Sequence, residues 1–238
     1  MATRVATRHG NTSRALRLKL QLSVDEYAAA ARAFWTQRRL AELLPDYLFC
    51  IHTIIRASVP LMEAACDKAR GLSARDPVAA SLAAYLGHHV PEERHHDDWL
   101  LDDLAELGVS RDEVLRKVPS PTVAMLVGAQ YYWIHHYHPV ALLGYIAVLE
   151  GYPPEEDHIL SVIERTGLTP RAFRTFLKHA RLDPHHRDDL DAALDSMALT
   201  KGHESLVAMS ALETQHLLAV LLREVVRDHS SRESKRLA

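Results

Sequence analysis

One stretch of the chain, from Val118 to Leu149, contains no aspartate, glutamate, lysine or arginine. A segment this apolar fits either a membrane span or a helix in the core of a helical protein. It is interrupted at residues 135–139 by the sequence His-His-Tyr-His-Pro, which is incompatible with a helix that faces lipid. We therefore expect a buried core helix, bent by Pro139, and no membrane association.

Helical periodicity extends through almost all of the remaining chain, and glycine is sparse. No run alternates with a period of two residues for long enough to predict a strand. The pattern predicts an all-α fold, a single-domain bundle of about seven helices over residues 21–228. The basic residues 1–20 and the polar residues 229–238 are expected to be flexible tails. The expected helices cover residues 23–43, 45–72, 76–108, 111–117, 121–151, 154–167, 170–197 and 204–227, with a kink at Pro60 and a break near Val90 and Pro91.

Charge and cysteine content exclude several classes of protein. The chain has 28 basic and 31 acidic residues and a net charge of -3, which argues against nucleic acid as a partner. Cys50 and Cys66 form no metal or redox motif, so we expect buried free thiols in a reducing compartment. The basic N-terminal segment lacks the apolar run of a signal peptide. These features favour a cytoplasmic location.

The first candidate metal ligands are His179, Asp183 and His186. On an α-helix, positions i, i+4 and i+7 share one face, and here that face is otherwise apolar. A carboxylate buried there without a partner would cost several kcal/mol, and two imidazoles with a carboxylate suit a divalent first-row metal. The alternative is that Asp183 caps a new helix that begins at Pro184, in which case the two histidines are ordinary polar residues.

A second group of candidates lies between Tyr85 and Leu100, where two helical registers compete. The register of His89, Glu93 and His96 continues along an apolar face, so it would bury its polar groups. The register of His88, Glu92 and His95 continues through Asp102, Asp103 and Glu106 and is expected to face solvent. We favour the first register because it buries its polar groups in an apolar stripe. Within it, Glu93-x-x-His96 has the spacing by which bundle helices hold dinuclear metal sites.

Glu150 is the third candidate, because it is the only acidic residue between Glu113 and Glu155. It follows the apolar helical face of Leu143, Ile146 and Ala147. A carboxylate near the C-terminus of a helix is disfavoured by the helix dipole and calls for a positive partner, which a metal ion would supply. The alternative is that Glu150 marks the end of the helix and reaches solvent.

Together, the His179-x3-Asp183-x2-His186 element, Glu150 and the segment from Glu93 to Trp99 resemble the haem-oxygenase-like di-iron oxidases, and within them the iron-containing redox enzymes. The resemblance covers roughly residues 45–225. It implies a haem-oxygenase-like bundle of seven helices that binds no haem. It also implies a metal site in which His96, Glu150, His179, Asp183 and His186 are ligands. The family often has a glutamate seven residues before the first ligand histidine, where this chain has His89; Glu93 would replace it, or His89 would ligate, and Glu63 is a weaker candidate.

The resemblance further implies two Fe(II) ions per chain and O2 as co-substrate. Glu93, Glu150 and Asp183 would be the carboxylates of the catalytic centre. The expected substrate is a small metabolite, such as an amino acid or a derivative, that undergoes N-oxygenation, desaturation or C–C cleavage. An external electron donor and a homodimer are compatible with this expectation. Two alternatives remain: a thiaminase-like hydrolase on the same fold, which needs a catalytic cysteine, and a non-catalytic metal-binding bundle.

Overall fold

The computed structural model describes residues 11–152 and 154–237, and every regular element in these ranges is helical. Three breaks, after residues 93, 136 and 149, interrupt the segments that carry the candidate ligands. The α-helices are α1 (Thr12–Leu22), α2 (Val24–Trp35), α3 (Leu40–Leu72), α4 (Pro77–Glu93), α5 (His96–Glu106), α6 (Arg111–Arg116), α7 (Pro121–His136), α8 (Leu142–Leu149), α9 (Glu156–Thr166), α10 (Arg174–Ser196) and α11 (Lys201–Leu237), and the 3-10 helices are η1 (Pro139–Ala141) and η2 (Pro170–Phe173).

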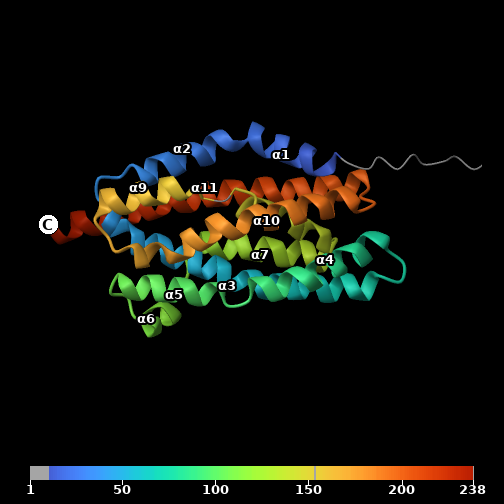
Figure 1. The fold of residues 1–238 in the computed structure, drawn as a ribbon, viewed down its shortest axis with the longest axis horizontal. Helices are drawn as coiled ribbons and strands as arrows, with labels where there is room; N and C mark the ends of the chain where they lie inside the picture. The colour runs from blue at the N-terminus through green and yellow to red at the C-terminus, as the bar shows by residue number, and fades with distance from the viewer. Residues whose placement is uncertain (1–10, 153, 238) are drawn as a thin grey trace, which may run out of the picture.

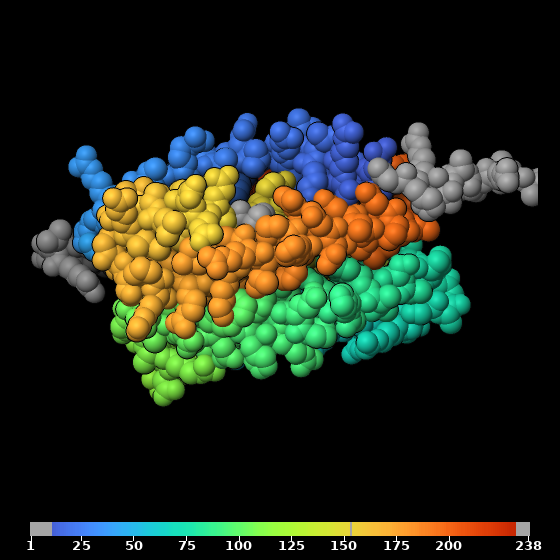
Figure 2. Space-filling view, in the orientation of Figure 1, coloured from blue at the N-terminus to red at the C-terminus, as the bar shows by residue number. Residues whose placement is uncertain are grey.

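The helices form a single elongated bundle, in which most of them run along the long axis (Figure 1). The long helices α3 and α11 lie at its centre: α3 packs against α4, α5 and α7, and α11 packs against α2, α7 and α8. Helix α10 crosses the face seen in Figure 2, between α1 and α2 on one side and α4 and α5 on the other. The expected all-α, single-domain fold is confirmed.

Among the helices of the described residues, α3 and α11 reach the length and apolarity of a membrane span by composition. In each, much of the apolar stretch is covered by the rest of the bundle, 50% for α3 and 67% for α11. Their apolar character is therefore accounted for by packing inside the protein.

Helix α8 is the most apolar element, and it is buried along its whole length against α11. Gly144 permits this close approach, since a Cβ atom there would lie 2.2 Å from the carbonyl oxygen of Val207 and 2.7 Å from the amide nitrogen of Ala211. Glu150 caps the end of α8, so the packing of α8 on α11 fixes where that carboxylate lies.

Two expected breaks lie elsewhere than the sequence indicated. Pro91 sits inside α4, and the chain breaks one turn later, where Arg94 is extended and His95 adopts a left-handed backbone with φ of 70°. Helix α7 ends at His136 rather than bending at Pro139, which starts η1. The expected full burial of residues 118–149 is also wrong, because the α7 side chains of Met125 and Tyr132 are about half exposed.

The expected N-terminal tail is wrong for residues 12–20, which belong to α1. Leu16 and Leu20 are buried, and Ser13 donates hydrogen bonds to the Asp195 carboxylate at 2.9 Å from both its amide and its hydroxyl. The basic composition of this segment predicts a tail, whereas the i, i+4 spacing of Leu16 and Leu20 is that of an amphipathic helix. Residues 1–10 lie outside the described part of the chain.

The remaining helix boundaries differ in two places. The helix expected over residues 23–43 is divided, with α2 ending at Trp35 and α3 starting at Leu40. The expected C-terminal tail is also wrong, since α11 continues through Leu237, while residue 238 is outside the described residues. None of these differences affects the segments in which the candidate ligands lie.

Candidate metal centre

Helix α10 carries three of the candidate ligands on one side. It runs without interruption from Arg174 to Ser196, with Pro184 inside it, so the alternative in which Asp183 caps a new helix is wrong. Asp183 and His186 are buried, with 3% and 7% of their surface exposed, and His179 is half-buried. The spacing i, i+4, i+7 therefore places these three side chains along the inner face of the helix.

Helices α4 and α5 contribute the second group of candidates, and the buried register is that of His89, Glu93 and His96. In contrast, the side chains of His88 and His95 are each 80% exposed. Glu93 and His96 are not a pair within one helix, because Glu93 ends α4 and His96 begins α5. The left-handed turn at His95 still brings them together, with 3.1 Å between Glu93 Oε2 and His96 Nδ1.

Glu150 turns inward from the end of α8 rather than towards solvent, and only 13% of its side chain is exposed. Its carboxylate lies 3.1 Å from His89 Nε2 and 3.6 Å from His186 Nδ1. The positive partner that the helix dipole calls for is thus provided by His89 of α4, whose pKa is raised to about 9 by the bond to Glu150 and the nearby carboxylates.

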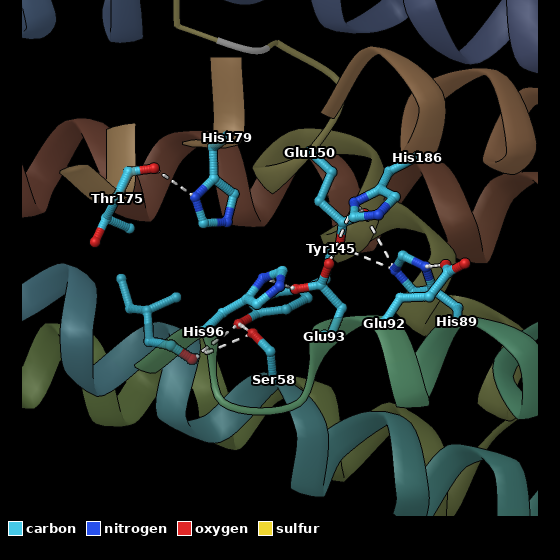
Figure 3. Close-up of polar contacts among 11 residues, drawn as sticks. Ser58, His89, Glu92, Glu93, His96, Tyr145, Glu150, Thr175, His179 and His186 are labelled. Atoms are coloured by element: carbon cyan, nitrogen blue, oxygen red, sulfur yellow. Dashed lines mark hydrogen bonds and ion pairs between the residues drawn. The ribbon is translucent and has the colours of Figure 1, made fainter. Parts of the chain in front are cut away.

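A group of His89, Glu92 and His186 overlaps one of two adjoining groups, and within each group the ligand atoms lie within 4.8 Å of one another. The two adjoining groups share a residue. One contains Glu93, His96 and His179, and the other contains His89, Glu93 and Glu150, so Glu93 belongs to both (Figure 3). His186 joins the second group, with its Nδ1 3.2 Å from Glu93 Oε1. The arrangement can hold two cations with a carboxylate between them.

Several buried polar atoms in these groups have no hydrogen-bond partner, although oppositely charged atoms lie near. Leaving such atoms unpaired inside a protein costs free energy, and buried carboxylates repel one another. Metal coordination would satisfy all of them at once, so the residues present fit a metal centre. The atoms in the groups are Glu93 Oε1, His96 Nδ1, Glu150 Oε2 and His186 Nδ1. Asp183 belongs to none of the groups but lines the adjoining cavity, and its Oδ1 is likewise buried without a partner.

Proton affinities in the cluster are strongly shifted. Burial raises the pKa of Asp183 to about 8, and the charges of Glu150 and Glu93 add to this effect. Burial lowers the pKa of His89, but the bond to Glu150 and the surrounding carboxylates outweigh it and raise the pKa to about 9. Burial likewise raises the pKa of Glu150 and lowers that of His179. The cluster without metal therefore holds protons that cations would displace.

A cavity of about 360 Å³ adjoins the cluster. Glu93, Glu150, His179 and Asp183 line one part of it, and the rest of its lining comes mainly from apolar and aromatic side chains. Among the residues that the structure describes, no lysine or arginine lines it. Tyr152 and His158 also line the cavity and are exposed, so it reaches the surface near them. Other lining residues are Tyr27, Trp35, Tyr47, Ile51, Ile54, Ile55, Ser58, Phe173, Phe176 and Leu218.

One expected candidate does not join the cluster, and some contacts were missed. Glu63 is 47% exposed and pairs with Arg94 at 2.7 Å. Glu92, assigned to solvent, is exposed but reaches His89 Nδ1 at 3.5 Å. Thr175 accepts a hydrogen bond from His179 through its backbone carbonyl, a contact that no sequence motif signals. Its i, i+4 spacing to His179 was the one available indication.

A separate group of ligand-type residues, Asp76, His138 and His203, needs no metal. The amide of Val140 donates to His138 Nδ1 at 3.1 Å, so the neutral ring carries its proton on Nε2. That proton is donated to Asp76 Oδ2 at 3.0 Å. The atom that would have to coordinate a cation is therefore already a hydrogen-bond donor.

Solved structures similar to this chain share its fold. One is a domain of unknown function with a haem-oxygenase-like fold from Shewanella denitrificans OS217, with a TM-score of 0.71 and 19% identity over 94% of this chain and 92% of that one. A TenA homologue from Pseudomonas syringae pv. tomato has a TM-score of 0.71 and 11% identity, covering 95% and 97% of the two chains. A CADD-like protein of unknown function from Nostoc punctiforme PCC 73102 has a TM-score of 0.69 and 17% identity, covering 92% and 96%.

These likenesses establish the haem-oxygenase-like fold. A comparison with curated protein sequences finds no significant match. The sequence model of one family, described as iron-containing redox enzyme, matches residues 32–218, which include every candidate ligand. The chain therefore belongs to the iron-containing redox enzyme family.

Proposed function

We propose that this protein is an O2-dependent non-haem di-iron oxidase or oxygenase that acts on a small, largely apolar metabolite. The observation that carries the proposal is the pair of adjoining ligand groups that share Glu93 and border an apolar cavity. Family membership supports iron as the metal, and mixed imidazole and carboxylate ligands suit iron that keeps open positions. When bound, the iron pair would supply the electrons and the site at which O2 is reduced.

In this proposal the protein's own residues hold and order the centre. Glu93, His96 and His179 would hold one iron, and His89 or Glu150 with His186 would hold the other. Asp183 lines the same cavity as Glu93 and Glu150 and would complete the ligand set. Burial of these groups keeps water away from the reacting atoms.

The lining of the cavity favours a mainly apolar substrate. Away from the cluster, its ionisable groups are the phenols of Tyr27, Tyr47 and Tyr152 and the imidazole of His158. A free amino acid would find no lysine or arginine there for its carboxylate. An anionic group of the substrate would therefore be bound at the metals, with the apolar part in the cavity.

The hydrolase alternative receives less support from the site. A thiaminase-like mechanism needs a reactive thiol, but Cys50 and Cys66 are buried and neither lines the cavity. Burial raises the pKa of the Cys50 thiol to about 12 and also raises that of Cys66. Thiols that stay protonated are poor nucleophiles.

Oxygen uptake tests the proposal. Protein loaded anaerobically with Fe(II) should consume on the order of one O2 per pair of iron ions when mixed with oxygenated buffer in an electrode cell. Glu150→Ala should slow this uptake at least about tenfold, because an inward ligand is lost. The matched control is Glu155→Ala, which removes an exposed carboxylate five residues further on and should behave as the wild type.

Equal uptake by Glu150→Ala and wild type, at equal iron content and helical circular dichroism, would show that Glu150 has no part in the reaction. Wild-type protein that binds iron but consumes no oxygen faster than free Fe(II) would contradict the proposal as a whole.

A further inference from the structure

Asp103 is a completely buried carboxylate on α5, two helical turns after His96 and on the same face. Its Oδ2 accepts a hydrogen bond from the amide of Thr175 at 2.9 Å, and its Oδ1 lies 3.6 Å from Arg174 Nε. The sequence pattern had assigned Asp103 to a solvent-facing register. Its burial instead places a negative charge at the beginning of α10.

Helix α10 has no side-chain cap of its own. Its N-cap residue is Phe173, which has no oxygen to accept a hydrogen bond from the first amides of the helix. Asp103 supplies that acceptor from a neighbouring helix, and its charge is favourable at the positive end of the α10 dipole. The start of α10 is therefore fixed in height and rotation relative to α5.

Thr175, the second residue of α10, also contacts the ring of His179, which lies one turn further along the helix. His179 Nδ1 lies 2.9 Å from the carbonyl oxygen of Thr175 (Figure 3). Because a carbonyl can only accept, Nδ1 carries the proton, and Nε2 is left with its lone pair free for the group of Glu93 and His96. Thr175 thus connects to Asp103 through its amide and to His179 through its carbonyl.

Two contacts join α5 and α10. The first is the hydrogen bond between Asp103 and Thr175, and the second is the contact between the rings of His96 and His179, whose centroids are 5.2 Å apart. The spacing of His96 to Asp103 on α5 is seven residues, and that of Thr175 to His179 on α10 is four. Loss of the hydrogen bond between Asp103 and Thr175 would let His179 shift relative to His96.

We propose that Asp103 is a positioning residue for the metal position formed by Glu93, His96 and His179. By capping α10 from α5, it holds His179 opposite His96 with the correct nitrogen turned inward. The position formed by His89, Glu150 and His186 has two of its side chains on α4 and α8, and its α10 residue lies eleven positions after Thr175, so this position should depend less on the contact. The inference rests on the proposed function only in requiring that the cluster binds metal.

Titration of the full chain with Co(II), followed by visible absorbance and calorimetry, separates the two positions. Asp103→Ala should weaken one of two binding events by about 10–100-fold and leave the other within about twofold. The matched control is Asp102→Ala, which removes an exposed carboxylate 3.6 Å from the same Arg174 and should bind like the wild type. Loss of both events or of neither by a folded Asp103→Ala would overturn the inference.

Asp103→Asn keeps the proposal testable if Asp103→Ala does not fold. The amide side chain retains an acceptor for Thr175 but loses the charge, so the same binding event should weaken by less than in Asp103→Ala. Weakening of both events equally, or of neither, would overturn the inference. If the wild-type protein binds no Co(II), both the proposed function and this inference are contradicted. If the wild type binds Co(II) at both positions but the Asp103 variants do not weaken one position selectively, the inference alone is contradicted.

A second readout needs no metal. Long-range ¹⁵N–¹H spectra of the metal-free protein should show His179 as the Nδ1–H tautomer in the wild type and in Asp102→Ala. In Asp103→Ala the ring should populate both tautomers, because the carbonyl of Thr175 is no longer held in place. An unchanged His179 tautomer in that variant would contradict the positioning role.

Discussion

At the scale of residues, burial and neighbouring charges together set the pKa values of the candidate metal ligands. Three carboxylates, Glu93, Glu150 and Asp183, share a small volume with four imidazoles. Without cations, burial and mutual repulsion raise the pKa of Asp183 to about 8. Such a site stores protons in the absence of metal, and this has a measurable consequence.

Metal binding at pH 7 should release protons. Asp183, with a pKa near 8, and His89, with a pKa near 9, both carry protons there, and each must lose its proton to become a ligand. We expect about two protons released if His89 ligates and about one if it stays paired with Glu150. Calorimetry in two buffers of different ionisation enthalpy measures this number. It should fall towards zero above about pH 9, and no release at pH 7 would contradict the account.

The candidate ligands on α10 could be predicted because helical spacing brings them to one face. His179, Asp183 and His186 follow from i, i+4, i+7 alone. Asp103 did not follow, because its partner Thr175 is 72 residues away and the contact is made to a backbone amide. Spacing within a helix reveals shared faces, while contacts between helices depend on how they pack.

At the scale of elements, the breaks between helices position the candidate ligands as much as the helices do. The left-handed turn at His95 joins Glu93 and His96 across two helices, and the end of α8 turns Glu150 inward. The sequence indicated a break in this region but placed it at Pro91, since proline is the usual signal. A histidine with positive φ carries no such signal, so the position of the break could not be predicted.

The packing of α8 on α11 supplies a stability prediction. Gly144→Ala should destabilise the protein by about 1–3 kcal/mol or more, because its Cβ would collide with the backbone of α11 at Val207 and Ala211. Gly128→Ala is the matched control, since its Cβ meets nothing within 4 Å on an exposed face of α7. It should be neutral or stabilise by about 0.5–1 kcal/mol through helix propensity. Urea unfolding measures both, and equal stability of the two variants would contradict the packing described.

At the scale of the whole molecule, the bundle places an apolar cavity beside a charged cluster. The all-α class and the family followed from periodicity and from a few spaced residues. The cavity did not, because α2, α3, α8, α9, α10 and α11 each contribute only a few of its side chains. Likewise, the sequence predicts a tail where α1 lies, whereas Arg17 of α1 forms an ion pair with Asp191 of α10 at 2.8 Å.

We propose that this cluster binds two iron ions, and the iron content of the protein tests this proposal most directly. After anaerobic loading with Fe(II) and removal of excess metal, elemental analysis should give about two iron ions per wild-type chain. The double variant His179→Ala, His186→Ala removes one ligand from each position and should retain far less, while His88→Ala, which removes an exposed imidazole, should match the wild type. Iron content in the double variant equal to that of the wild type would contradict the account.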